Sequence, residues 1–512
     1  MKANFENLNK LLLEMQKIES ISSLLHWDQE TFMPENGGEI RSKEIAYLST
    51  LHHQKQVSDE FKNELGKFVN TGNGKILSNE INDDDKRFLD RVWKDFHYEN
   101  SLPQEFVEEL SELTSTSQMK WVKAKEQNDF SLFEPYLKKM VDMKKKEADY
   151  YGYSTNRYDA LLEQFEPGIT TEKLDDLFNG LKTRLIKLIE KIKNSPVKIN
   201  EVHGKFDEDN QWKLGMKIIK DMGFDLNSGR QDKSAHPFTI SFHPSDVRLT
   251  TRVHEDNFLS SLFASIHEAG HGIYEQGLLE ENFGSPFGQA ASFGIHESQS
   301  RLWENQIGRG KNFWKKYLPI LKDHFPQFKS MDLDEYFKII NIVKPSLIRI
   351  EADEVTYSLH IMLRYDIEKM LINEDLPVKD LPKIWNKKMK EYFDIVPDSN
   401  ANGVLQDVHW SMGAFGYFPS YALGNFYAAQ FFQKASEAIP DFDKKIQNGE
   451  LLSLKNWLNE NVHQYGRKYL PDELIKKVVG NPMSVDPFME YLESKYGEIY
   501  ELKSSASSRR GS

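Results

Sequence analysis

The sequence predicts a mainly α-helical protein, a large helical body with one small β-hairpin. Apolar residues recur at three- and four-residue spacing through most of the 512 residues, which is the period of helices with one buried face. One short segment instead alternates apolar and polar residues, as a strand does. No fixed repeat and no long linker interrupts the chain, so these elements are expected to form one large body.

The first helix is expected at residues 6–20, where Leu8, Leu11, Leu12 and Met15 share one face. The same spacing predicts helices at 83–97, 103–126, 131–150, 171–193, 334–373, 381–394 and 485–498. Pro103 in a first turn and Thr171 before Glu172 are typical of helix starts. We expect residues 1–502 to form a single two-lobed domain. The polar residues 503–512 are expected to be a disordered tail.

Residues 236–253 form the alternating segment. Two short runs are separated by His243, Pro244, Ser245 and Asp246, which are residues that favour turns. We therefore predict a β-hairpin directly before the motif described below.

Composition restricts the class of protein. The chain is 39% hydrophobic and 28% charged with a net charge of −13, which disfavours a nucleic-acid partner. No stretch approaches the roughly 20 apolar residues of a membrane helix, and the N-terminus does not resemble a signal peptide. Cysteine is absent, which fits a cytoplasmic location and leaves His, Asp and Glu as the available metal ligands.

A metal motif lies in residues 260–278. His267 and His271 are four residues apart in a predicted helix, so both imidazoles project side by side and can bind one zinc ion. Glu268 is placed to take a proton from an attacking water. Gly270 and Gly272 each cost about 1 kcal/mol of helix propensity relative to alanine. We interpret these glycines as a sign of close backbone approach.

A catalytic zinc usually has three protein ligands and one water. The next predicted helix, 292–306, offers His296, Glu297 and Glu304. Glu297 is favoured because it comes early in a helix about one loop away, while His296 is the competing ligand.

The chain resembles the carboxypeptidase Taq family of metallocarboxypeptidases over nearly its whole length. Besides the metal motif, the resemblance rests on His26–Pro34, His236–Phe238, Asp246–Thr250, His296–Gln299, Ile348–Asp353 and Gly403–Trp410. It supports Glu297 as third ligand. It implies a mainly helical fold with a deep substrate groove, a zinc or cobalt ion, a homodimer, and removal of single residues from peptide C-termini with broad specificity.

The resemblance leaves one position unexplained. Many zinc peptidases have an acid four residues after the third ligand, which orients a zinc histidine. Arg301 occupies that position here, so the residue that orients His267 or His271 is left open.

Further site residues are expected outside the metal motif. His409 and Tyr421 are candidate catalytic donors to the oxyanion, although Tyr421 lies in an aromatic-rich stretch where most rings are core. Arg349 is the first candidate to bind the substrate carboxylate and Arg248 the second, because a guanidinium matches a carboxylate with two hydrogen bonds. In a helix, Arg349 could instead pair with Asp353.

The predicted hairpin is a candidate for substrate binding as well. One of its strands would pair with an extended peptide beside the zinc, which would place His236 near the bound chain. Packing of the hairpin explains most of its residues equally well.

Two alternative functions stay open at this stage. A zinc oligopeptidase or endopeptidase would use the same metal chemistry. A non-catalytic helical metal-binding protein would need a fourth protein ligand, and none has suitable spacing.

Overall fold

The computed structural model describes residues 5–77 and 81–502, and the predicted tail at 503–512 lies outside them. Helices make up most of the described chain, which confirms the predicted fold class. The chain forms two compact units. Unit 1 contains Met1–Ser101, Val202–Phe337 and Phe431–Pro482, and unit 2 contains Leu102–Glu201, Lys338–Gln430 and Met483–Ser512.

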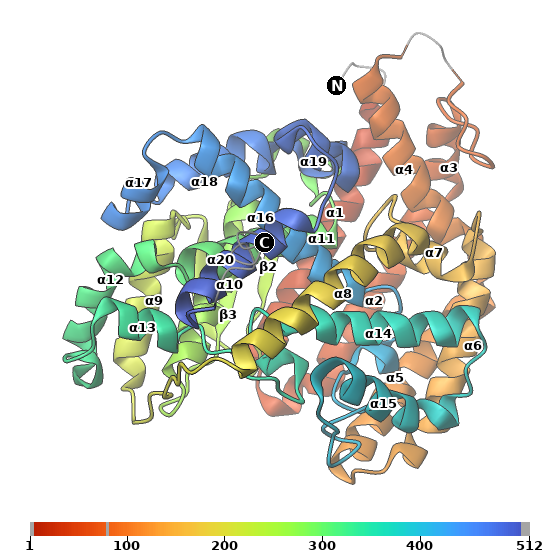
Figure 1. Cartoon of the computed structure of the whole chain (residues 1–512). Coiled ribbons are helices and arrows are strands. Elements are labelled where there is room, and N and C mark those ends of the chain that lie inside the picture. Colours follow the sequence, from red (N-terminus) through yellow and green to blue (C-terminus); the bar gives the residue numbers. More distant parts are fainter. Residues whose placement is uncertain (1–4, 78–80, 503–512) are drawn as a thin grey trace, which may run out of the picture. The chain divides into compact units, whose positions relative to one another are not determined.

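The helices of each unit are shown in Figure 1. Unit 1 contains α1 (Glu6–Thr31), α2 (Gly38–Gln56), α3 (Asp59–Gly66), α4 (Asp83–Ser101), α9 (Glu208–Met222), α10 (Phe258–Gln276), α11 (Phe293–Arg301), α12 (Lys311–His324), α17 (Phe442–Asn448), α18 (Leu452–Asn461) and α19 (Pro471–Val479). Unit 2 contains α5 (Gln104–Glu126), α6 (Glu134–Tyr151), α7 (Arg157–Leu162), α8 (Thr171–Lys193), α14 (Tyr357–Asn373), α15 (Leu381–Phe393) and α20 (Asp486–Ile499). The boundary between the units falls within α13 (Leu333–Ile339) and near the middle of α16 (Phe418–Ala438).

Most predicted helices are present with small changes at their ends. The predicted helix at 171–193 matches α8, whose first turn is capped by Thr170 through a hydrogen bond from the Lys173 amide. The N-terminal helix is longer than predicted and continues to Thr31. Ile21, Leu24 and Leu25 continue the three- and four-residue spacing past residue 20, so the predicted end came too early.

The long helix predicted at 334–373 is wrong. The chain leaves helical geometry after α13, forms a short 3-10 turn at Arg349–Glu351 (η8), and re-enters a helix at α14. Pro345 has no amide proton to continue a helix. The Asp353 carboxylate accepts hydrogen bonds from the amides of Lys344 and Thr356, which fixes the non-helical segment. Arg349 is therefore not on a helix with Asp353.

A small sheet in unit 1 contains the predicted hairpin. Strands β2 (Thr239–His243) and β3 (Asp246–Thr251) pair in antiparallel fashion, with a register shift between Ser241 and His243. A further strand, β1 (Gly229–Lys233), pairs in parallel with β3, so the order is β1-β3-β2. Its sequence is polar without apolar alternation, so periodicity could not identify it.

Helix α10 is the buried centre of unit 1. Leu262, Ile266 and Ile273 are almost fully buried, and a Cβ built at Gly272 would lie 2.8 Å from the Leu249 side chain in β3. The metal motif is therefore held on a helix that packs directly against the sheet (Figure 1). Among the described residues, no helix is both long and apolar enough to cross a membrane.

Candidate metal and active site

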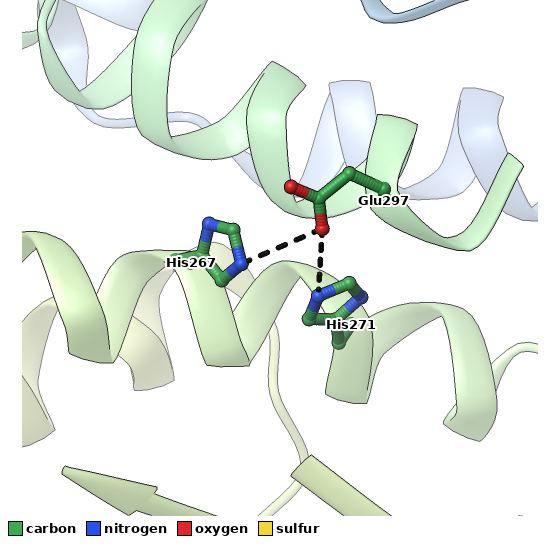
Figure 2. Close-up of side chains that lie close together, drawn as sticks. All are labelled: His267, His271 and Glu297. Atoms are coloured by element: carbon green, nitrogen blue, oxygen red, sulfur yellow. Dashed lines mark ion pairs between the residues drawn. The ribbon is translucent and has the colours of Figure 1, made fainter. Parts of the chain in front are cut away.

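The predicted metal ligands come together in unit 1. Glu297 Oε2 lies 3.4 Å from His271 Nε2 and 3.7 Å from His267 Nε2, and one ligand atom from each residue lies within 4.8 Å of the others. Figure 2 shows the carboxylate facing both imidazoles across the gap between α10 and α11. Ligand atoms about 2.1 Å from a tetrahedral zinc ion lie about 3.4 Å apart, so this donor set fits one such ion.

A glycine allows the two helices to approach closely enough for these ligands to meet. A Cβ built at Gly270 in α10 would lie 2.7 Å from both the Gln299 carbonyl oxygen and Ser300 Cα in α11. Real Cβ atoms do not approach backbone atoms this closely. The close backbone approach inferred from the glycines is therefore present at Gly270, and at Gly272 the neighbours are side chains.

Glu297 presents one carboxylate oxygen to the histidines and the other to an arginine. Arg301 Nε donates to Glu297 Oε1 at 2.7 Å, while Oε2 faces His267 and His271. Burial opposes ionisation of Glu297, but Arg301 and the histidines hold its pKa well below the usual range. Arg301, the residue found where an acid was expected, thus fixes the direction of the third ligand.

His267 is oriented by Glu304. Its Nδ1 lies 2.9 Å from Glu304 Oε2, which leaves Nε2 facing the other ligands. Burial opposes ionisation of Glu304, but the hydrogen bond with His267 and the nearby arginines lower its pKa to about 2. A carboxylate on the second imidazole nitrogen fixes the tautomer and ring direction of a metal-binding histidine.

The sequence analysis offered Glu304 as a possible metal ligand and did not assign it this role; it lies in the π-helix η6 (Leu302–Gly308). α11 continues into η6, whose wider turns change the direction in which each side chain projects. Helical spacing of seven residues places Glu304 on the same face as Glu297, but its contact with His267 depends on how α11 and η6 pack against α10, which spacing does not give.

His296, the competing ligand, contacts His271 and Glu275 instead. Its ring stacks on His271 with the centroids 4.4 Å apart, and its Nε2 lies 2.8 Å from Glu275 Oε1. Among the described residues, it is not part of the group whose ligand atoms converge.

Glu268 is buried beside the ligands. Its Oε2 accepts a hydrogen bond of 2.6 Å from Thr239 Oγ1, which also donates to the Glu268 carbonyl. Burial raises the pKa of Glu268, so its carboxylate is a stronger base than an exposed one. Thr239 therefore connects the edge strand β2 to the carboxylate expected to act as base.

The other unit 1 candidates lie in or beside the hairpin. Arg248 Nε and Nη2 each donate to one carboxylate oxygen of Asp246 at 3.0 Å. The Arg248 guanidinium also lies over the Trp27 ring, 4.3 Å from its centroid. Its planar fork is thus already matched with a carboxylate. His236 is exposed just before β2, and its carbonyl accepts a hydrogen bond from Ser234 Oγ.

Arg349 belongs to a buried cluster in unit 2. Its Nε donates to Asp407 at 3.0 Å and its Nη1 donates to the Tyr357 hydroxyl at 3.1 Å. Asp407 also binds Arg364, so two guanidinium groups share one carboxylate. The alternative pairing of Arg349 with Asp353 is wrong, because Asp353 binds backbone amides and the Thr356 hydroxyl.

The two candidate donors lie in the same unit 2 cluster. His409 Nε2 is 3.3 Å from the Tyr421 hydroxyl, and the Tyr421 ring lies 5.0 Å from the Arg349 guanidinium. Burial lowers the pKa of His409 to about 4, so its imidazole is neutral near pH 7 and offers one N–H donor. The structure thus groups Arg349, His409 and Tyr421 in unit 2, and the metal ligands with Glu268 in unit 1.

Two histidines and a glutamate with a buried glutamate next to the first histidine define a metal-dependent peptidase. Residues 7–496 match the profile of the family described as carboxypeptidase Taq (M32) metallopeptidase. The chain belongs to this family. It is a metallocarboxypeptidase that hydrolyses C-terminal residues from peptides.

Individual relatives cover almost the whole chain. It is 40% identical over 495 residues to carboxypeptidase 1 of Bacillus subtilis (strain 168), covering 96% of this chain and 98% of the relative. It is 36% identical over 513 residues to thermostable carboxypeptidase 1 of Thermus thermophilus, covering 97% and 99%. The crystal structure of the M32 carboxypeptidase from Deinococcus radiodurans R1 matches with a TM-score of 0.93 at 33% identity, covering 98% of this chain and 100% of that chain.

Proposed function

We propose that this metallocarboxypeptidase uses one zinc ion held by His267, His271 and Glu297, with cobalt as the alternative metal. The converging ligand atoms of these residues are the observation that carries the proposal. When bound, the ion supplies Lewis acidity to the attacking water and to the scissile carbonyl.

Glu268 acts as the general base in this proposal. It takes a proton from the attacking water and delivers it to the leaving amine, which releases the C-terminal amino acid. Its burial and raised pKa support this role, because a stronger base takes the proton more readily. The hydrogen bond from Thr239 keeps the carboxylate in one direction without neutralising it.

Arg349 binds the C-terminal carboxylate of the substrate. Arg349 and Arg364 share the single negative charge of Asp407, so the three side chains carry a net positive charge in a buried environment. An uncompensated buried charge is costly, and a substrate carboxylate would neutralise it. Arg248 is less suited to this role because its Nε and Nη2 already form a bidentate pair with Asp246.

His409 and Tyr421 donate to the oxyanion that forms during attack. Since His409 is neutral and its Nε2 lies close to the Tyr421 hydroxyl, the pair can offer hydrogen bonds without adding a second buried charge. These donors stabilise charge that develops only in the transition state, so they act on kcat.

The edge strand β2 holds the substrate in extended form. It lies at the edge of the sheet, where an added peptide strand can pair with its backbone, and the exposed His236 would lie near that peptide. Ser20 Oγ donates to the Phe242 carbonyl in the later part of the strand, so pairing would use the end near Thr239. Backbone pairing is independent of side chains, which supports broad specificity.

The test uses a mixed-sequence peptide, with and without a C-terminal amide, incubated with zinc-loaded protein and followed by mass spectrometry. A ladder that shortens one residue at a time from the free C-terminus, with the amidated peptide spared, is expected. Internal cleavage of both peptides would contradict carboxylate recognition by Arg349.

The expected homodimer and cytoplasmic location are separate proposals, tested by light scattering and cell fractionation.

A further inference from the structure

Glu368 in α14 is a buried carboxylate that accepts hydrogen bonds from several parts of unit 2. Its Oε1 accepts from the Trp410 indole at 2.8 Å. Its Oε2 accepts from the Tyr158 hydroxyl at 2.6 Å and from the Gly416 amide at 2.9 Å. The side chain is fully buried, so these donors replace the water that a carboxylate would otherwise bind.

Residues 410–416, called the 410–416 turn below, begin within the 3-10 helix η10 (His409–Met412) and end in the turn that follows it, with Trp410 and Gly416 at the two ends. His409 directly precedes this turn, and Tyr417 directly follows it. The His409 ring packs on Phe418 at the start of α16, with centroids 4.4 Å apart, and its Nε2 faces Tyr421 in the same helix. Glu368 therefore binds both ends of the segment that connects His409 to its hydroxyl partner.

The turn can pack against α7 only because it has a glycine at position 416. Gly416 has a φ of +90°, and a Cβ built there would lie 2.7 Å from the Leu161 carbonyl oxygen in α7. The turn thus lies directly on α7, with the Gly416 amide facing Glu368. The buried Lys144 in α6 forms an ion pair with Glu147 and also interacts electrostatically with Glu368.

We propose that Glu368 is a positioning residue for His409: by binding both ends of the 410–416 turn, it sets the direction of the imidazole relative to Tyr421. The inference rests on the proposed role of His409 in catalysis. Arg349 hydrogen-bonds to Asp407 and Tyr357, which both lie outside the 410–416 turn. Loss of the Glu368 contacts should therefore affect the chemical step and leave binding of the substrate carboxylate intact.

The first variant is Glu368→Gln, which keeps the shape but replaces one acceptor oxygen by an amide donor. That donor must face the N–H of either Trp410 or Gly416, so one end of the turn is released. We expect kcat to fall about 10- to 100-fold, as for a misplaced catalytic group. KM should stay within about twofold, because the substrate contacts remain. Metal content should be unchanged.

A double-mutant cycle with His409→Ala separates positioning from general stabilisation. If Glu368 acts through His409, then Glu368→Gln should lower kcat in the wild-type background and have no further effect in the His409→Ala background. An equal loss in both backgrounds would overturn the inference. If His409→Ala leaves kcat unchanged, the proposed role of His409 fails, and the positioning role fails with it.

Asp175→Asn in α8 is the control, because it removes a different carboxylate that binds the helix of Glu368. The Asp175 carboxylate binds Tyr365 and Lys369 of α14 without any contact to the 410–416 turn, so kcat should be unchanged.

Trp410→Phe serves if Glu368→Gln does not fold, since it removes one hydrogen bond to Glu368 and keeps an aromatic ring. It should lower kcat only when His409 is present, and an unchanged kcat would overturn the inference.

Discussion

The Nδ1 atom of His267 lies 2.9 Å from Oε2 of Glu304, seven residues beyond the third ligand Glu297. The contact orients a metal-binding imidazole from a π-helical turn, and Arg301 occupies the position where the sequence analysis looked for an acid. The carboxylate thus comes from a position three residues later than the one considered in the sequence, and it still faces the second nitrogen of a candidate metal-binding histidine.

Glu304→Gln should weaken metal binding. The substitution removes the charge that fixes the His267 tautomer, and such changes typically cost about 10- to 100-fold in metal affinity. Competition with a chromophoric chelator measures the affinity. Glu275→Gln is the matched control, because Glu275 contacts His296, which is outside the converging ligand group. Equal affinities in the two variants would contradict the role of Glu304.

Glu268→Gln should keep the metal and lose turnover. The variant retains the size of the side chain but cannot accept a proton, and general bases contribute about 10²- to 10⁴-fold to rate. Metal content is measured by elemental analysis, and kcat with a peptide that has a free C-terminus. Undiminished turnover in a fully metal-loaded variant would exclude Glu268 as the base.

Arg349→Ala should reduce kcat/KM for peptides with a free C-terminus far more than for amidated ones. A charge-assisted pair with a buried arginine is worth about 2–5 kcal/mol, which corresponds to at least about 30-fold. Arg248→Ala is the comparison, since Asp246 already binds its guanidinium, and it should keep the wild-type preference for the peptide with a free C-terminus. An equal loss on both peptides for Arg349→Ala would reject carboxylate recognition.

Gly270→Ala should destabilise unit 1 and weaken metal binding together. The added methyl group meets the backbone of Gln299 and Ser300, so α10 and α11 must separate, at a cost of about 1–3 kcal/mol. Gly180→Ala in α8 is the control, because a Cβ there has no neighbour within 4 Å and should be stabilising by up to about 1 kcal/mol. Thermal unfolding and chelator competition test both effects, and similar tolerance at the two glycines would contradict the packing argument.

The stability contribution of His409 should depend on pH. Burial lowers its pKa from 6.5 to about 4, so between these values the unfolded chain binds more protons than the folded one. The folded state therefore loses stability as pH falls from 6.5 towards 4. Unfolding temperatures at pH 7 and 4.5 should differ less in His409→Gln than in the wild type. The same pH dependence in both proteins would contradict the lowered pKa of His409 in the folded state.

The sequence alone predicted the helical class, the hairpin, the family resemblance and the three candidate metal ligands. These features depend on local periodicity or on side chains a few residues apart in one helix, where spacing fixes geometry. His267 and His271 are examples, since four residues of α-helix place them side by side. Glu297 followed from the need for a third ligand on the next element.

The tertiary structure alone decided which residues surround that site. β1 has no apolar alternation and is a strand only because β3 lies beside it. Glu304 reaches His267 because α11 and η6 pack against α10, and Arg349 binds Asp407 because Pro345 and Asp353 interrupt the predicted helix. Such contacts depend on where separate elements pack, and burial, which sets the pKa values of Glu268 and His409, exists only in the folded chain.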